Sequence, residues 1–407
     1  MKFIDDFNNP KDPLAVRVER FNRYLNKIRG THDWMFQRAH GGGAPCSSQK
    51  QRGSGAGPRR HFIRLDSNDY LGLGRHPAIK RAFDEAFKLY GMGTDGSPLL
   101  SGYSQATLKL EHALAGLHHK EDAVVFASTY AANLAVLQGL LLTSDCVILD
   151  QAVHTSVRDG ALLAGCQVVI FKHNDPGDLE KILKKTNPKK TLVCVDSVYS
   201  MRGCVADLVP LVALVKKSGA MMVVDEAHAV GVFGKKGEGR VCDLGLSASV
   251  NVITGSLGKA LATHGGYVAA DRSLCQFLRY RAHPYMFSSA LPPTVSASAL
   301  KSLEIMRSGA LVQKLKTNIR SVREAMKKRG LAVNDDDTAT IPVPVGDEVA
   351  TMQSAARLRK KGILINPSIY PAVPKGRGIL RMSISAQHSV DELSRAVMEI
   401  AGVGRKK

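Results

Sequence analysis

Cysteine and long apolar runs are both scarce in this sequence, and their scarcity narrows the class of protein. The seven cysteines among 407 residues are scattered and form no Cys-x-x-Cys pair, so neither a disulfide framework nor a structural zinc site is indicated. The most apolar stretch, residues 134–142, is too short to cross a bilayer. Because the chain starts with an acidic segment broken by prolines, we expect a cytoplasmic protein without a metal site or a membrane span.

Negative charge is scarce as well. The 36 Asp and Glu residues are outnumbered by 56 Lys and Arg residues, which gives a formal net charge of +20. Such an excess attracts polyanions in general, including nucleic acids, phosphorylated substrates and acidic carrier proteins. The basic residues are spread along the whole chain, without the dense basic and aromatic run that is typical of a nucleic-acid arm. We therefore expect a solvated basic surface and no nucleic-acid partner.

Two nucleotide-binding motifs are missing. The Asp-Glu-Ala-His run at 225–228 resembles a helicase box, but the chain has no P-loop of the form GxxxxGKS or GxxxxGKT, which excludes a helicase. The glycines at 231–240 lack the GxGxxG spacing of a dinucleotide-binding loop, and we interpret them as a flexible loop.

Short β-branched runs alternate with helical patterns from residue 61 onward. Each run is followed by about 12 to 20 residues of amphipathic pattern. The runs occupy 124–127, 147–150, 168–171, 192–196 and 222–225. Strands that crossover helices bury on both faces show such continuous apolar runs. The predicted fold class is therefore α/β, with a mostly parallel sheet flanked by helices and with its ligands at the carboxyl ends of the strands.

Three segments are expected along the chain. Residues 1–60 form an N-terminal arm, helical over 13–38, with a linker rich in glycine, serine and basic residues over 40–60. Residues 61–309 form the large domain that holds the parallel sheet. Residues 310–407 form a smaller C-terminal α+β domain.

Two residues at strand ends suit a pyridoxal 5'-phosphate (PLP) cofactor. Lys259 follows a strand and a small Ser-Leu-Gly run that lets its amine reach into a cleft, and lysine amines form imines. Asp225 ends another strand, where a carboxylate can keep the pyridine nitrogen of PLP protonated. A surface lysine and a helix-capping aspartate are the alternatives for each residue taken alone.

Further polar residues follow or lie within other strands. Ser128 and Thr129 open a helix, where backbone N–H groups bind phosphate well, although both could be simple caps. His154 could lay its imidazole over the cofactor ring, and Ser200 offers a hydroxyl in a polar loop. Arg381 lies within an apolar strand pattern and suits the carboxylate of an amino acid. Together with Lys259 and Asp225, these residues favour one shared cofactor site.

An ordered series of motifs resembles one family, the α-oxoamine synthases, which are fold-type I PLP enzymes. The resemblance runs from about residue 66 to the C-terminus. It rests on SNDYLGL (67–73), GTDGSPLLSGYS (93–104), STYAAN (128–133), DSVYSMRG (196–203), VVDEAHAVGVFG (223–234), SLGK (256–259) and FSSALPP (287–293). Two positions depart from the family pattern: Thr129 replaces the usual glycine, and Arg202 replaces the usual acidic residue.

The resemblance implies roles around the cofactor ring. Lys259 would carry PLP as a Schiff base and would act as the acid and base of the reaction. Asp225 would pair with the ring nitrogen, and His154 would stack on the ring as a third catalytic residue. His228 and Ser200 would bond the ring oxygen.

The resemblance also implies residues around the phosphate and the substrate. The phosphate would be held by Ser128, Thr129, Tyr130 and Ser256. Ser289 would come from the partner subunit, because sites of this family are built across a homodimer interface. Asn68 and Arg381 would bind the carboxylate of the substrate.

The reaction that the resemblance implies is a decarboxylative condensation. A small L-amino acid (glycine, alanine or serine) would be joined to an acyl-CoA or acyl-carrier thioester to give an α-amino ketone. The basic surface would suit the phosphates of CoA or an acidic carrier protein. A fold-type I aminotransferase or aldol-type lyase is one alternative, and a non-catalytic subunit of a heteromeric synthase is another. Lys259 argues against the second alternative, because such a subunit usually lacks that lysine.

Overall fold

The computed structural model of the chain describes residues 12–29, 48–51 and 60–404, which fall into two compact units. The large unit comprises residues 68–200 and 204–316. The small unit comprises the N-terminal segment up to Ser67, a short piece at 201–203 and the C-terminal segment from Thr317. The predicted domain limits near residues 60 and 310 stay predictions.

A seven-stranded sheet forms the centre of the large unit, with the strand order β3-β11-β10-β9-β6-β4-β5. Its strands are β3 (Asp122–Phe126), β4 (Cys146–Asp150), β5 (Gln167–Phe171), β6 (Thr191–Asp196), β9 (Met221–Asp225), β10 (Val252–Ser256) and β11 (Gly266–Ala270). β11 pairs antiparallel with β3 and β10, and the remaining neighbours pair in parallel. The predicted α/β class with a mostly parallel sheet is therefore confirmed.

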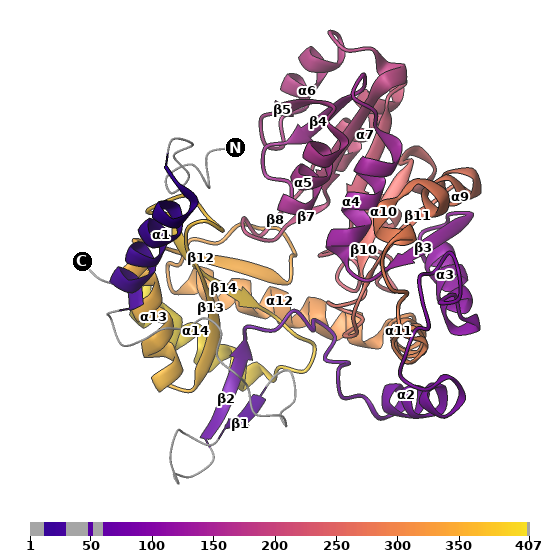
Figure 1. Cartoon of the computed structure of the whole chain (residues 1–407). Coiled ribbons are helices and arrows are strands. Elements are labelled where there is room, and N and C mark those ends of the chain that lie inside the picture. The colour runs from indigo at the N-terminus through magenta and orange to yellow at the C-terminus, as the bar shows by residue number, and fades with distance from the viewer. Residues whose placement is uncertain (1–11, 30–47, 52–59, 405–407) are drawn as a thin grey trace. The chain divides into compact units, whose positions relative to one another are not determined.

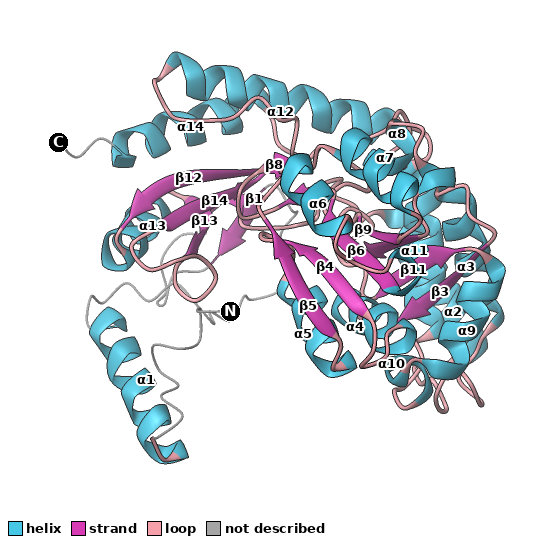
Figure 2. Ribbon diagram, turned by 90° about the horizontal axis from the view of Figure 1, so that it is seen from above, coloured by secondary structure: helices cyan, strands magenta, loops and turns pink. Residues whose placement is uncertain are grey.

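Helices cover both faces of this sheet (Figures 1 and 2). One face packs against α4 (Thr129–Leu140), α5 (Thr155–Ala164), α9 (Arg272–Arg281) and α10 (His283–Met286), and the other against α6 (Pro176–Leu183), α7 (Leu208–Ser218) and α8 (Arg240–Asp243). The large unit also holds α2 (Pro77–Tyr90), α3 (Gln105–Leu117), α11 (Pro293–Met306) and two short 3-10 helices (Pro188–Lys190 and Ser247–Ser249). A small hairpin joins β7 (Val198–Tyr199) to β8 (Cys204–Val205).

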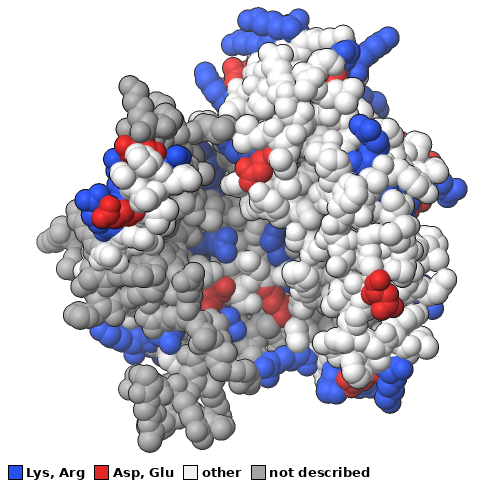
Figure 3. All heavy atoms as spheres, in the orientation of Figure 1, with Lys and Arg blue, Asp and Glu red and all other residues white. Residues whose placement is uncertain are grey.

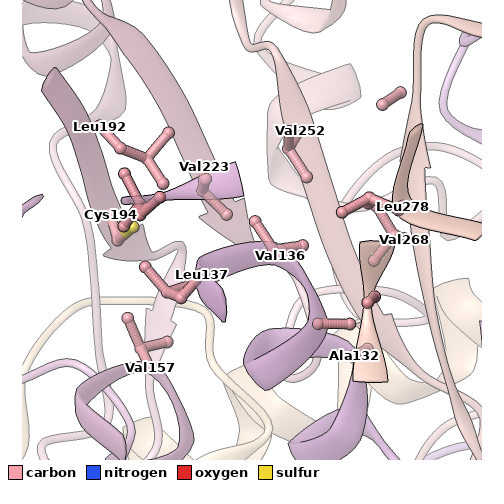
Figure 4. Packing of buried hydrophobic residues seen from close by; sticks show 14 of the residues in the cluster. Ala132, Val136, Leu137, Val157, Leu192, Cys194, Val223, Val252, Val268 and Leu278 are labelled. Atoms are coloured by element: carbon pink, nitrogen blue, oxygen red, sulfur yellow. The ribbon is translucent and has the colours of Figure 1, made fainter. Parts of the chain in front are cut away.

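Alternate residues of the central strands enter two different hydrophobic clusters. Leu192 and Cys194 of β6 pack with α4 and α5, whereas Val193 and Val195 pack with α6 and α7. Figure 4 shows Leu137 of α4 among the residues of the first cluster. Because successive side chains of a strand point to opposite faces, a strand covered on both sides must be apolar throughout. This burial explains the continuous apolar runs in the sequence.

The small unit contains a five-stranded sheet with the order β1-β2-β13-β14-β12. Its strands are β1 (Ser48–Gln51), β2 (Arg60–Leu65), β12 (Thr340–Gly346), β13 (Ile363–Ser368) and β14 (Gly378–Ser383). Its helices are α1 (Leu14–Arg29), α13 (Glu348–Lys360) and α14 (Val390–Gly404). α12 (Ala310–Lys328) begins in the large unit and ends in the small one.

Part of the segment expected to be a linker forms strands of this small sheet. β1 lies within the segment 40–60, and β2 begins at its end. Both strands belong to a sheet whose other strands are C-terminal, because β1 pairs with β2 and β2 pairs in parallel with β13. α1 coincides with the first part of the helix expected over 13–38. Residues 30–38 and most of the expected linker lie outside the described residues. In the part of the chain that the structure describes, no helix is both long and apolar enough to span a membrane.

Candidate active site

Four strands of the large unit bring polar side chains to one edge of the sheet. β4, β6, β9 and β10 are parallel neighbours that end at Asp150, Asp196, Asp225 and Ser256. The carboxyl ends of parallel strands are the usual place for a ligand in a sheet of this kind. The ends of these strands and the loops that follow them carry six of the twelve residues singled out in the sequence: His154, Ser200, Asp225, His228, Ser256 and Lys259.

Asp225 is a buried carboxylate with well-placed donors. Its side chain is 7% exposed at the end of β9. Asn133 Nδ2 donates to Asp225 Oδ2 at 2.7 Å, and the backbone N–H of Ala227 donates to Oδ1 at 2.8 Å. Because both donors are uncharged, a buried cation placed beside this carboxylate would gain a strong electrostatic partner.

His154 is connected to Asp225 through two buried side chains. Asn133 Nδ2 also donates to Ser156 Oγ at 2.9 Å, and Ser156 Oγ lies 2.8 Å from His154 Nδ1. Since Ser156 also donates its backbone N–H to Nδ1, this ring nitrogen acts as an acceptor. We call Asp225, Asn133, Ser156 and His154 the Asn133 network.

The imidazole of His154 is held in its neutral form. Burial lowers the pKa of His154, and the charge of Lys259 adds to this effect against the opposing charge of Asp225. A neutral, partly buried ring is suited to lie flat against another aromatic ring. The backbone N–H of His154 donates to Asp196 Oδ2 at 3.0 Å, which fixes the loop that carries the ring.

Lys259 follows β10 in a tight turn. Ser256 Oγ accepts the backbone N–H of Gly258 at 3.2 Å, and the Lys259 carbonyl accepts the N–H of Ala262 at 2.9 Å. The charge of Lys259 influences the pKa values of both His154 and Asp196. The structure therefore brings Lys259 together with His154 and the two strand-end aspartates.

Asp196 is a site residue that the sequence analysis did not single out. It pairs in register with Asp225 on the neighbouring strand. Burial and the nearby charge of Asp225 raise the pKa of Asp196 well above its usual value. Two carboxyl groups buried side by side disfavour each other's charged form. The signal was present in the sequence, because both apolar runs end in aspartate.

His228 and Ser200 lie on loops after β9 and around the β7–β8 hairpin. Tyr70 Oη is 2.7 Å from His228 Nδ1, so that the imidazole has a fixed orientation. Ser200 begins the turn between β7 and β8 and is partly exposed. Tyr70 was part of the quoted SNDYLGL motif but was not predicted as a site residue.

The start of α4 is the position that was predicted to hold the phosphate. Ser128 caps the helix by accepting the backbone N–H of Ala131 at 3.0 Å. A Cβ atom at Gly266 would lie 2.4 Å from the backbone nitrogen of Thr129, so only glycine lets β11 approach the first turn of α4 this closely. Tyr130 is 43% exposed, and its hydroxyl donates to Asp159.

The remaining predicted residues lie outside this cluster of strand ends. Ser289 is exposed in the segment before α11, where the N–H of Ala290 donates to the Gly96 carbonyl at 3.0 Å. Asn68 is partly buried in the large unit, and its carbonyl accepts the N–H of Tyr70 at 2.9 Å. Arg381 lies in β14 of the small unit. The roles of all three residues stay predictions.

The site fits PLP. Lys259 would supply an amine for the aldehyde of the cofactor, and the buried Asp225 carboxylate would suit its protonated ring nitrogen. The helix start at Ser128, opened by the close approach at Gly266, suits its phosphate. Among the described residues, no group of three or more His, Cys, Asp and Glu side chains is arranged to hold a metal ion.

Comparison with known proteins identifies a family and several relatives of this chain. The family model described as aminotransferase class I and II matches residues 60–400. The 8-amino-7-oxononanoate synthase of Symbiobacterium thermophilum is 38% identical over 350 residues, which cover 85% of this chain and 89% of that one. The 8-amino-7-oxononanoate synthase 1 of Bacillus subtilis is 33% identical over 390 residues, with 94% and 97% covered.

A solved structure agrees with these relatives. The serine palmitoyltransferase of S. paucimobilis with bound PLP and myriocin matches with a TM-score of 0.91 and 28% identity, over 97% of this chain and 99% of that one. The predicted family, its fold and its PLP cofactor are thereby confirmed. The chain belongs to the aminotransferase class I and II family and, within it, to the PLP-dependent α-oxoamine synthases.

Proposed function

We propose that the protein condenses a small L-amino acid with an acyl thioester, releases CO2 and forms an α-amino ketone. The observation that carries this proposal is the meeting of Lys259, His154 and Asp225 at one edge of the sheet, in a chain of this family. Glycine, alanine and serine are the proposed amino acids, and CoA or a carrier protein bears the acyl group.

Lys259 is proposed to hold the cofactor and to move the reacting proton. When bound, PLP withdraws electrons from the α-carbon of the amino acid, which makes that carbon nucleophilic. The Nζ atom of Lys259 would bind the cofactor aldehyde at rest and accept the α-proton during the reaction. Its nearness to Asp196 and Asp225 keeps this amine in a polar site among the strand ends.

Asp225 is proposed to hold a proton on the ring nitrogen. The carboxylate can do so only while it is charged and correctly oriented. Asn133 Nδ2 and the Ala227 N–H fix both of its oxygens at 2.7 and 2.8 Å. Asn133 is therefore a positioning residue for Asp225, and through Ser156 also for the His154 ring.

The remaining residues are proposed to hold the cofactor ring and the substrate. His154 would cover one face of the ring, while His228 and Ser200 would bond its oxygen. Asn68 and Arg381 would bind the carboxylate of the amino acid, for which a guanidinium is the best-suited side chain. The group that leaves as CO2 would then be oriented by these contacts.

The phosphate side is proposed to be completed by a second copy of the chain. Ser128, Thr129, Tyr130 and Ser256 would contact the phosphate from one subunit, and Ser289 would contribute from the other. In the part of the chain described, Ser289 is exposed rather than packed within its own subunit. We propose a cytoplasmic homodimer.

The basic surface supports an anionic acyl donor. Figure 3 shows Lys and Arg side chains gathered around α6 at one end of the large unit, where Lys181, Lys184 and Lys185 are exposed. Phosphates of CoA and an acidic carrier protein would both be attracted by such charge. Turnover assays with both kinds of thioester would distinguish these two acyl donors.

Reductive trapping tests the assignment of the cofactor lysine. The PLP-loaded protein would be treated with borohydride, digested and mapped by mass spectrometry. The expected result is a cofactor label on Lys259 and no label in a Lys259→Arg control. A label on another lysine, at equal yield in the control, would overturn the assignment. Parallel turnover assays with acyl-CoA and acyl-carrier thioesters would identify the donor.

A further inference from the structure

A cysteine, a histidine and an aspartate contact one another in sequence near the candidate active site, and the proposed reaction uses none of them. Cys204 Sγ is 3.5 Å from His173 Nε2, and His173 Nδ1 is 2.9 Å from Asp150 Oδ1. All three belong to the large unit. Cys204 and His173 are partly exposed, whereas Asp150 is fully buried.

Asp150 is held as a charged acceptor. Backbone N–H groups of Ala152 and Asn174 donate to its two oxygens at 2.7 and 2.8 Å. Burial alone would raise the pKa of Asp150, but the hydrogen bonds from His173, Asn174 and Ala152 outweigh it and lower the pKa. The carboxylate therefore presents a fixed negative charge to His173 Nδ1.

This carboxylate determines which nitrogen of His173 is a base. Because Nδ1 donates its proton to Asp150, Nε2 carries the lone pair and faces the thiol of Cys204. The ring is kept in place by Tyr199, which meets it edge-on with centroids 4.5 Å apart. A thiol, an imidazole and a carboxylate in this order form the arrangement by which cysteine nucleophiles are activated.

Among the described residues, the two other partly exposed thiols, Cys166 and Cys242, have no histidine base in contact. Cys166 donates to the Ala161 carbonyl at 3.8 Å, and burial raises its pKa. Cys242 contacts Ser247 Oγ at 3.1 Å, and burial likewise raises its pKa. The two residues are matched internal controls for Cys204, because all three are partly exposed in the same unit.

We propose that Cys204 is a nucleophilic thiol that low-molecular-weight disulfides modify, with His173 as its base and Asp150 as the positioning residue. The Cys204 S–H bond breaks and its proton passes to His173 Nε2. The thiolate attacks one sulfur of the disulfide, a new S–S bond forms and the old one breaks. The leaving thiolate takes the proton from Nε2, so that the products are a mixed disulfide and one free small thiol.

The position of Cys204 gives this modification a route to the cofactor site. Cys204 pairs with Tyr199 in the β7–β8 hairpin, and Ser200 begins the turn between the two strands. A bulky adduct on Cys204 would disturb this pairing and the turn beside it. That consequence rests on the proposed function, whereas the reactivity of the thiol does not.

The test measures the rate of modification at each cysteine in one sample. The full-length Cys46→Ser protein, loaded with PLP, would be treated with oxidised glutathione and mapped by mass spectrometry over time. General-base assistance is typically worth about 100-fold or more, so Cys204 is expected to react at least tenfold faster than Cys166 and Cys242. The His173→Gln variant should slow Cys204 to the rate of these two controls without changing their own rates.

Two outcomes would overturn the proposal. The first is that Cys204 reacts no faster than Cys166 and Cys242 in the protein that retains His173. This comparison does not depend on whether the His173→Gln variant folds. The other is a His173→Gln variant in which Cys204 keeps its rate while the controls stay slow. Neither outcome depends on acyl transfer, so failure here is distinguishable from failure of the proposed function.

Discussion

Replacing Asn133 with alanine tests whether this buried amide positions Asp225, the carboxylate proposed to bind the cofactor. The side chain is fully buried in α4 and donates to Asp225 at 2.7 Å and to Ser156 at 2.9 Å. A hydrogen bond to a charged group is worth about 1.5–3 kcal/mol, and a neutral one about 0.5–1.5 kcal/mol. Of the two hydrogen bonds that Asn133→Ala removes, the one to Asp225 therefore accounts for most of the lost free energy.

The affinity for PLP is the quantity that should change. At most about 1.5–3 kcal/mol of the PLP binding free energy depends on this hydrogen bond, so the affinity should weaken by no more than about 10- to 150-fold. The dissociation constant would be measured by titrating PLP into the apoprotein and following its absorption. Ser156→Ala is the matched comparison, because it breaks only the neutral hydrogen bonds of the Asn133 network and should weaken the affinity less, by at most about 2- to 13-fold.

The comparison between these two variants decides the question. Equal losses of PLP affinity in Asn133→Ala and Ser156→Ala would mean that Asn133 acts through general packing. Unchanged affinity in Asn133→Ala would show that Asp225 needs no support from α4. Either result would refute the argument that Asn133 holds Asp225 in place.

Three further predictions concern the core, the pH dependence and the substrate. Leu137→Ala should lower the free energy of unfolding in urea by about 2–5 kcal/mol, because Leu137 is fully buried, whereas Leu163→Ala, 64% exposed, should change it by about 0.5 kcal/mol or less. Burial lowers the pKa of His118 from 6.5 to about 3. As the pH falls below about 6.5, the His118 imidazole is therefore protonated in the unfolded chain but not in the folded one. The free energy of unfolding should decrease by at most about 1.4 kcal/mol per pH unit in this range. Urea titrations of His118→Gln should lack this part of the slope, and an identical slope would contradict the assignment. Arg381→Lys should raise the KM for the amino acid about tenfold, since one of two carboxylate hydrogen bonds is lost, and steady-state kinetics with unchanged KM would contradict its predicted role.

The sheet of the large unit was predictable because its strands are buried on both faces. Val193 and Val195 pack on one side of β6 while Leu192 and Cys194 pack on the other, so every position had to be apolar. The strand ends then followed from where these runs stop. Lys259 was singled out because it follows a strand, now β10, and a short Ser-Leu-Gly run.

The Asn133 network could not be predicted in the same way. Asn133 lies inside a helix, and its side chain meets Ser156 of another helix and Asp225 of a strand 92 residues further along the chain. Such contacts depend on how α4 and α5 pack on the sheet, which periodicity does not reveal. Asp196, by contrast, ends a strand in the same pattern as Asp225 and could have been found.

The small sheet was missed at its N-terminal edge for a related reason. β2 pairs in parallel with β13, joining Ile63 to Ile363. The pairing of two segments so far apart leaves no local pattern, and the glycine-rich and basic segment before β2 indicated only a linker. Tyr130 was expected to contact the phosphate of the cofactor. Its hydroxyl donates to Asp159, and the contact with phosphate stays a prediction.

The central claim is tested most directly by the stoichiometry of the reaction. The PLP-loaded protein would be mixed with glycine, alanine or serine and a series of acyl-CoAs, while CO2 and free CoA thiol are measured together. The account predicts one CO2 for each CoA released, only when both substrates are present, and no turnover in Lys259→Ala. Amino-group transfer to an oxo acid without CO2 release would contradict the account and would favour an aminotransferase.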